Sequence, residues 1–277
     1  MVKLVTDSVA DLPQEVIDEL GITVVPLEVS FGRNTYRDRV DITPAEFYSR
    51  LADASIMPYT SAPSPGVFAD VFDSIAAHSD EIVAVFVPRR FSATQEAALA
   101  GIRLMKRKCT VEVIDSTFAI MGQGLLVIEA ARRALAGAGM QEIVRMLSDN
   151  VPKVHVRVTL DTLEYLRRGG RIGKIQAFLG SMLKMNPIVG LKDGEAFPFT
   201  RVRTRSRAVE WLYNFACGFS KVRALAIEYG SDSTEAYKLA DRFKTVFPGI
   251  PLYISNVSPV VGTHTGPGVL AVTVMEE

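Results

Sequence analysis

The sequence predicts an α/β protein of two domains, each built on a mainly parallel sheet with flanking helices. Short apolar, β-branched runs alternate with segments of helical spacing along the chain, which is typical of βαβ units. At 277 residues the chain is long for one domain, and 48% hydrophobic residues are enough for a large core. We therefore expect one domain over residues 1–153 and a second over 154–277, with the segment 60–80 able to pack against the second domain.

The first half shows the order of strand, helix and strand. An apolar run over residues 2–6 predicts a buried strand that ends in the polar pair Asp7 and Ser8, and a short helix follows between Pro13 and Gly21. Further strands are expected over 22–31, 81–87 and 111–114, and further helices over 43–54, 67–75, 95–108, 118–136 and 141–147. The carboxyl ends of parallel strands meet at one edge of a sheet, so we expect ligand contacts there.

The second half again alternates strands with helices. Strands are expected over 154–159, 224–229, 252–257 and 269–275, helices over 161–168, from 209 onward and over 235–247, and a hairpin over 187–203. The hairpin turns at Asp193-Gly194, a dipeptide that favours tight turns between strands.

Three polar stretches far apart in the sequence are candidates for one binding site. Thr60 and Ser61 precede a turn stiffened by prolines, and Ser92 and Thr94 follow a strand at its carboxyl end. Near the end of the chain, His264 lies in a glycine-rich stretch over 260–268, which we interpret as a loop that presents the imidazole to a small acidic group. The simpler alternatives are an exposed histidine in a tight turn and a helix cap at one of the two hydroxyls of the second stretch.

Charge and cysteine content exclude several classes of protein. Lys+Arg and Asp+Glu both total 31, so the formal net charge of zero argues against nucleic-acid binding. Cys109 and Cys217 are far apart, which argues against a disulfide framework or a zinc site. No secretion signal is recognisable before Asp7, and the longest uncharged apolar stretch, 118–128, is shorter than the roughly 20 residues of a membrane span. We therefore expect a cytoplasmic protein without a stable membrane span.

The order of these motifs resembles one known family over the whole chain. The matching stretches are Thr6-Asp7-Ser8 with Asp11-Leu12-Pro13, Thr60-Ser61-x-Pro63-Ser64, Ser92-x-Thr94, Ile114-Asp115-Ser116, Leu163-Glu164-Tyr165-Leu166-Arg167-Arg168-Gly169-Gly170-Arg171-Ile172, and Gly262-Thr263-His264-Thr265-Gly266-Pro267-Gly268. They resemble the DegV family of bacterial fatty-acid-binding proteins. Two positions depart from the family pattern, because Ala93 and Ala271 stand where the family usually has glycine.

The resemblance implies a non-enzymatic carrier that holds one long-chain fatty acid, such as palmitate, between its domains. A separate fatty acid kinase would then phosphorylate the bound carboxylate, in the service of lipid transport and phospholipid synthesis. Thr60, Ser92 and His264 would bind the carboxylate, and the neighbouring Ser61, Thr94 and Gly266 are included in the expected site. The resemblance implies neither a cofactor nor a metal, and it is compatible with transient membrane contact.

Two further sets of residues are assigned roles in this interpretation. By composition, the candidates for the wall of the tunnel around the fatty-acid tail are Phe118, Met121, Phe178 and Met182, although ordinary core packing is the alternative. The cations Arg167, Arg168 and Arg171 would dock the kinase, and the alternative is a solvated helix end.

Two other functions remain open at this point. One is a hydrolase with Ser92 or Ser61 as nucleophile, His264 as base and Asp7 or Asp115 as the acid that orients the base, although no Gly-x-Ser-x-Gly motif occurs. The other is a protein that binds a small anionic metabolite with the same polar residues and without an apolar tunnel. A charged His264 beside a carboxylate would also make ligand retention weaken as the pH rises through the titration of the imidazole.

Overall fold

The computed structural model describes residues 1–53, 57–181 and 185–277, arranged around three sheets. The first has the strand order β2-β1-β6-β7, and all its pairings are parallel. Its strands are β1 (Lys3–Asp7), β2 (Thr23–Val25), β6 (Glu81–Phe86) and β7 (Thr110–Asp115). The parallel sheet expected for the first half is therefore confirmed. Residues 1–153, which include this sheet and the helices around it, are called the N-terminal lobe below.

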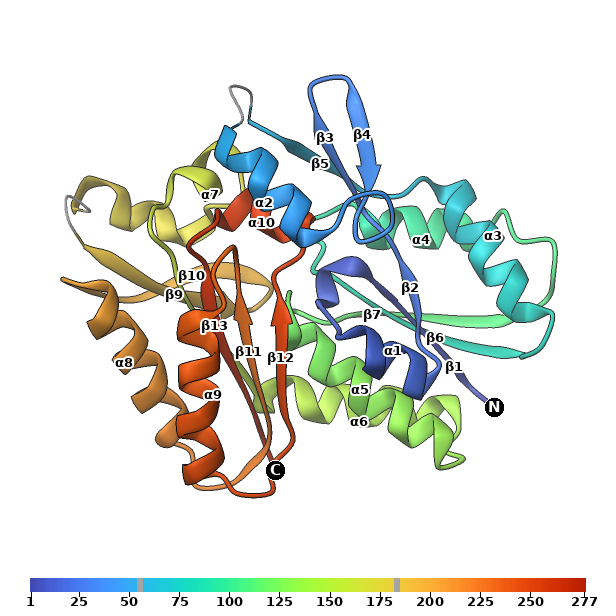
Figure 1. Cartoon of the computed structure of the whole chain (residues 1–277). Coiled ribbons are helices and arrows are strands. Elements are labelled where there is room, and N and C mark those ends of the chain that lie inside the picture. The colour runs from blue at the N-terminus through green and yellow to red at the C-terminus, as the bar shows by residue number, and fades with distance from the viewer. Residues whose placement is uncertain (54–56, 182–184) are drawn as a thin grey trace.

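Helices cover both faces of this first sheet (Figure 1). They are α1 (Gln14–Leu20), α3 (Pro65–Ala76), α4 (Thr94–Ile102), α5 (Met121–Leu135) and α6 (Met140–Asn150). On one face, Phe68 and Phe72 of α3 are completely buried against Phe86 and its neighbours in the sheet. The α3 part of the segment 60–80 thus packs on the sheet of the first half.

The second sheet has the order β10-β9-β8-β13-β11-β12. Its strands are β8 (Val154–Thr159), β9 (Asn186–Lys192), β10 (Glu195–Val202), β11 (Val222–Tyr229), β12 (Leu252–Asn256) and β13 (Leu270–Glu276). Only the pairing of β11 with β12 is parallel, so the prediction of a mainly parallel sheet in the second half is wrong. The cause is the last strand, β13, which returns between β8 and β11 and runs antiparallel to both. Residues 154–277 are called the C-terminal lobe below.

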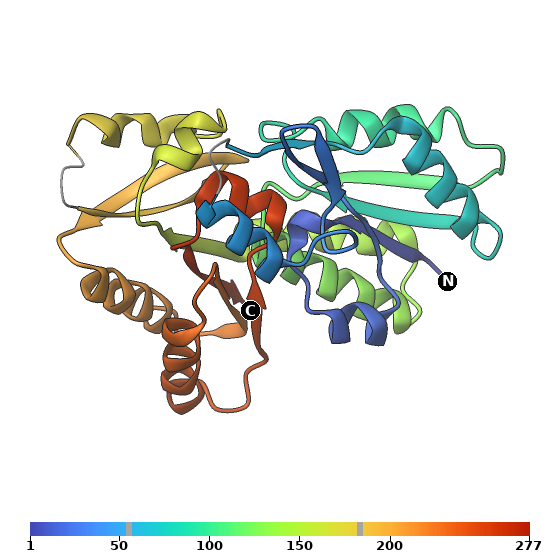
Figure 2. The ribbon, with the colours of Figure 1, turned by 45° about the horizontal axis from the view of Figure 1, so that its top comes forward.

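One face of the second sheet is covered by α8 (Arg205–Cys217) and α9 (Thr234–Val246), which lie on its outer side in Figures 1 and 2. The other face is directed toward the N-terminal lobe, and α5 contacts strands of both sheets. A single apolar cluster therefore includes side chains of β1 and α5 as well as of β8 and β13. The two lobes share a continuous core.

A small third sheet and two helices lie above the junction of the lobes (Figure 1). The sheet has the order β4-β3-β5, with β3 (Glu28–Phe31), β4 (Asn34–Arg37) and β5 (Tyr59–Ser61), all antiparallel. Beside it lie α2 (Pro44–Asp53) and α10 (Pro259–Thr265), which contact each other. The remaining short helices are η1 (Ser8–Ala10), η2 (Val151–Lys153), α7 (Glu164–Arg168) and η3 (Gly173–Ser181). Within the described residues, no helix has the length and apolar character needed to cross a bilayer.

Candidate functional site

A cavity of about 340 Å³ lies between the two lobes. Its walls are mostly aliphatic and come from both lobes, among them Val9, Val87, Val156, Val158, Val189 and Val260. The polar side chains on its lining belong to Thr60, Ser61, Ser92, Arg171, His264 and Thr265. The three stretches that sequence reasoning placed at one site thus line one cavity, and the rest of its surface is apolar.

His264 and Thr60 are in direct contact although they are 204 positions apart in the sequence. Nε2 of His264 lies 3.0 Å from Oγ1 of Thr60, at hydrogen-bond distance. Thr60 is held on β5, which pairs with β3, and His264 is near the end of α10. Residues 260–268, which the sequence predicts as a loop, therefore lie largely in the helix α10. This helix is capped at its start by Ser258 and ends at Gly266, which has a φ of 79°.

The other expected head-group residues lie near this pair but have different contacts. Oγ of Ser92 is 2.8 Å from Oγ1 of Thr94, which is buried at the start of α4. The Ser61 hydroxyl donates to Oε2 of Glu28 at 2.9 Å. Gly266 ends α10, and a side chain at this position would collide with the ring of Tyr165. Ser92 therefore shares the cavity with Thr60 and His264, whereas Thr94 and Gly266 support their neighbours.

Glycine is also required at position 169, directly after α7, where the chain lies against His264. A Cβ atom at position 169 would collide with Nδ1 of the imidazole, so only a residue without a side chain permits the observed approach. Nδ1 itself is buried and has no hydrogen-bond partner among the residues that the structure describes. The ring is thus held by packing on one side and by Thr60 on the other.

His264 is neutral at pH 7 in this environment. Burial, and next the positive charge of Arg171, lower the pKa of His264 from 6.5 to about 4. The expectation of a charged imidazole concerns the site with a carboxylate bound beside it, and it stays a prediction. A neutral imidazole has one N–H donor and one acceptor nitrogen, so His264 can still donate one hydrogen bond.

Arg171 lies on the cavity wall, a place that sequence reasoning did not give it. Its Nε donates to the carbonyl oxygen of Phe91 at 3.0 Å and its Nη1 to that of Gly169 at 2.7 Å. These two bonds hold the guanidinium beside the head-group residues. By contrast, Arg167 and Arg168 are exposed and both form ion pairs with Glu164. Only these two of the three predicted docking cations lie on the outer surface.

The predicted tunnel residues are found mainly in the core. Phe118 and Met121 are buried in the apolar cluster shared by the lobes, and Phe178 packs against the same cluster. None of these three is part of the cavity lining. Met182 is outside the described residues. The wall is formed instead by β-branched residues of strands, including Val156 and Val158 of β8. The alternation of β8 did indicate that these two valines share one face, but not that this face borders a cavity.

The arrangement around His264 differs from that of a hydrolase. A catalytic histidine needs an acid on the nitrogen opposite its nucleophile, and within the described part of the chain Nδ1 of His264 has no such partner. Asp7, one candidate for this acid, is buried elsewhere and accepts hydrogen bonds from the backbone N–H groups of Val9 and Val87 and from Gln123. The described residues also include no cluster of His, Cys, Asp and Glu able to hold a metal ion.

Comparison with known proteins decides the family. The model of the family described as "uncharacterised protein, DegV family" matches residues 1–277. The chain belongs to the DegV family. A DegV domain-containing protein of Caldanaerobacter subterraneus is 33% identical over 270 residues, covering 96% of this chain and 95% of that protein. One from Streptomyces coelicolor is 35% identical over 278 residues, covering 99% and 98%.

Solved structures of DegV proteins have the same fold. A fatty-acid-binding DegV family protein from Thermus thermophilus is 30% identical, with a TM-score of 0.90 over 100% of this chain and 99% of that one. DegV of Bacillus subtilis, described as a fatty acid binding protein, is 27% identical with a TM-score of 0.92 over 100% and 99%. A stearic-acid-binding protein from Eubacterium ventriosum is 28% identical with a TM-score of 0.91 over 100% and 98%. The two-lobed α/β arrangement is therefore that of DegV structures.

The position of Arg171 predicts its influence on His264. In the Arg171→Gln variant the pKa of His264 should rise from about 4 toward its ordinary value, because one of the two causes of the shift is removed. An NMR titration of the imidazole protons measures this, with His78 and His155 as internal references among the three histidines. Arg168→Gln, which changes an exposed cation of the same segment, serves as the control. An unchanged midpoint in Arg171→Gln would contradict the assignment.

Proposed function

We propose that this protein is a carrier that binds one long-chain fatty acid in the cavity between its lobes and presents the carboxylate to a fatty acid kinase. The kinase would convert the carboxylate to an acyl phosphate for lipid transport and phospholipid synthesis. The observation that supports this most directly is the meeting of Thr60, Ser92 and His264 on a mostly aliphatic cavity. Fatty acids are also the ligands named for the similar proteins from Thermus thermophilus and Bacillus subtilis.

The apolar wall would supply most of the affinity. A fatty acid of about 16 carbons buries on the order of 15 methylenes, each contributing about 0.8 kcal/mol, for a gross gain near 12 kcal/mol. A hydrogen bond to a charged group contributes only about 1.5 to 3 kcal/mol. The polar residues therefore chiefly determine which end of the ligand is held at the head-group site.

Charge in this head-group site would come from Arg171. Because His264 is neutral at pH 7, it and the hydroxyls of Thr60 and Ser92 can donate hydrogen bonds but carry no charge. The guanidinium of Arg171 is fixed on the same wall by two backbone carbonyls. It would favour the ionised carboxylate without a rigid bidentate clamp. A small anionic metabolite would find the same polar groups, but it would leave the long aliphatic wall without a ligand.

The kinase is proposed to dock beside the head-group site, on α7. Arg167 and Arg168 are exposed there and lie in the same segment as Gly169 and Arg171, which border the site. Both form ion pairs with Glu164 at the surface, where such pairs contribute little to stability. Their guanidinium groups can therefore exchange Glu164 for carboxylates of a partner. In this proposal the protein itself is not an enzyme, and it acts in the cytoplasm.

Native mass spectrometry followed by organic extraction tests the carrier function. The protein purified under mild conditions should retain one fatty acid per chain, because the aliphatic wall releases a buried tail slowly. A preparation that contains no lipid, binds none on addition and hydrolyses an ester probe would instead support the hydrolase.

Substitution of Ser92 tests the head-group assignment. Ser92→Ala should weaken fatty-acid binding by about 10- to 100-fold through the loss of one hydrogen bond to a charged group, with unchanged thermal unfolding. Ser64→Ala is the matched control, since Ser64 is exposed, caps nothing with its side chain and is not part of the cavity lining. Equal affinities for the two variants, measured by fluorescence titration, would show that the carboxylate lies elsewhere.

Substitution on α7 tests the docking surface. Arg168→Ala should leave the affinity for fatty acid unchanged. It should lower the rate of lipid phosphorylation by a fatty acid kinase about tenfold, because the apparent affinity of the protein for the kinase falls. Arg242→Ala is the control, because Arg242 also forms a surface ion pair, with Glu210 of α8, but lies on α9. The docking proposal fails if both variants support phosphorylation equally.

A further inference from the structure

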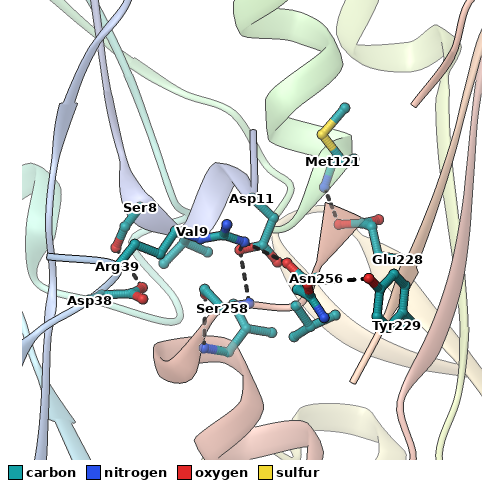
Figure 3. A network of polar contacts seen from close by, with 12 residues as sticks. Ser8, Val9, Asp11, Asp38, Arg39, Met121, Glu228, Tyr229, Asn256 and Ser258 are labelled. Carbon is teal, nitrogen blue, oxygen red and sulfur yellow. Dashed lines mark hydrogen bonds and ion pairs between the residues drawn. The ribbon is translucent and has the colours of Figure 1, made fainter. Parts of the chain in front are cut away.

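The segment that leads into α10 is held by three side chains of the N-terminal lobe. Figure 3 shows Arg39 and Asp11 among them, with Asn256 and Ser258 of the segment. Nη2 of Arg39 donates to the carbonyl oxygen of Asn256 at 2.5 Å. The Tyr48 hydroxyl donates to the carbonyl oxygen of Val257 at 3.3 Å, and the N–H of Ser258 donates to Oδ1 of Asp11 at 3.1 Å. Three consecutive residues of the C-terminal lobe are thus bound by side chains of the other lobe.

These contacts belong to a buried cluster in which carboxyl groups outnumber cations. Asp11 and Asp38 are each only 1% exposed. Arg39, at a φ of 58°, lies 3.4 Å from Oδ1 of Asp11, and the Ser8 hydroxyl donates to Oδ2 of Asp38 at 2.8 Å. Oδ2 of Asp11, Oδ1 of Asp38 and Nε of Arg39 are buried and have no hydrogen-bond partner in residues 1–53, 57–181 and 185–277. Such a cluster is sensitive to any change that separates the lobes or adds a charge.

We propose that Asp11, Asp38 and Arg39 form a latch between the lobes that positions α10, and that the latch thereby sets how long a fatty acid remains bound. The proposal rests on the proposed function, because it concerns the release of that ligand. The three are positioning residues, since none of them is part of the cavity lining.

The path from the latch to the head-group site is short. Ser258 caps α10, and His264 follows six positions later on the same helix. Val260 and Val261, between these two, line the cavity, as does Val9, which lies between Ser8 and Asp11. A shift of the segment 256–258 would therefore move both the imidazole and part of the apolar wall.

A second contact of the same kind joins the lobes nearby. Oε1 of Glu228 on β11 accepts the N–H of Met121 at the start of α5, at 2.7 Å, and the preceding Ile120 lines the cavity. Glu228 is completely buried, and its pKa is raised well above the ordinary value by burial and by the charge of Asp11. Burial therefore favours the protonated form of Glu228, as it does for the latch carboxyls.

Burial raises the pKa of Asp11 to about 7 and that of Asp38 to about 6, while the charge of Arg39 lowers both. The other titratable groups that face them are Asp7, whose pKa burial raises to about 7, Glu228 and Tyr48. Because the pKa values of Asp11 and Asp38 in the folded protein lie above the ordinary value of 3.8 for aspartate, the closed arrangement favours the protonated carboxyls. The stabilisation of the closed form by these protonated carboxyls is complete below about pH 4 and is lost as the pH rises through 6 to 7.

The latch therefore predicts faster release of fatty acid as the pH rises. Without ligand the pKa of His264 is about 4, and the variants at Asp11 and Asp38 separate the latch from the imidazole, because they leave His264 in place. Separating the lobes returns a carboxyl toward its ordinary pKa, and each pKa unit regained corresponds to a factor of up to about ten in the equilibrium between closed and open forms. Release requires only partial opening of the lobes, which returns only part of the pKa shift of each carboxyl. We therefore expect about a tenfold faster release at pH 8 than at pH 5.5.

Stopped-flow release of a fluorescent long-chain fatty acid to acceptor vesicles measures this rate. A double variant that combines the isosteric changes Asp11→Asn and Asp38→Asn should reduce the tenfold pH effect on the release rate to less than about threefold, because these two buried side chains can no longer ionise. Arg39→Met, which keeps an unbranched side chain but loses the bond to Asn256, should release the ligand at least about fivefold faster at pH 5.5. A fluorescent alcohol of the same length, which has no carboxyl of its own to titrate, should show the same pH dependence.

The control variants are Arg37→Met and Asp41→Asn, since these residues form an exposed ion pair and flank Asp38 and Arg39 in the sequence. They should release the ligand as the unmodified protein does. The NMR signals of His264 supply a second readout: Arg39→Met should shift them and Arg37→Met should not.

The outcomes separate the two proposals. If the unmodified protein binds no fatty acid, the proposed function fails. If it binds fatty acid but its release rate is the same from pH 5.5 to 8, or if Asp11→Asn with Asp38→Asn leaves the pH effect intact, the latch alone is overturned. Unmoved His264 signals in a folded Arg39→Met protein would overturn it as well.

Discussion

The contact between Thr60 and His264 is the interaction on which the arrangement of the site depends. Each residue lies on a short element, the three-residue strand β5 or the seven-residue helix α10, and elements of this length are not stable alone. Pairing with β3 orients Thr60, while the bonds of the N-terminal lobe to residues 256–258 orient the helix. Two weak elements thus produce a defined site because other parts of the fold hold both.

The sequence predicted the first sheet better than the second, for a physical reason. In the first half, β1 leads through α1 to β2 and β6 leads through α4 to β7, and both pairs are parallel, so local pattern and topology agree. In the second half, the last strand β13 inserts between β8 and β11, and this long-range pairing leaves no local signal. The helix α10 did have a signal, because Ser258 followed by Pro259 is a common helix start, but the glycines around His264 favoured a loop.

The polar part of the site was easier to predict than its apolar part. Hydroxyls and a histidine beside prolines and glycines are unusual enough to be noticed, and Thr60, Ser92 and His264 do line one cavity. Aliphatic residues look alike whether they face a cavity or a neighbouring side chain, so Phe118 and Met121 were assigned to the wall although they lie in the core. The charge of Arg171 and the neutral state of His264 depend on distances in the folded chain, which composition does not contain.

Neither lobe encloses the cavity by itself, because its walls combine Val9 and Val87 of one lobe with Val156 and Val189 of the other. A ligand that fills this space binds the folded chain and not the unfolded one, and so adds to its stability by mass action. The ligand would thus act as part of the shared hydrophobic core. A chain without ligand would open more often and meet proteases in that state, so that the abundance of the protein would follow the supply of that ligand.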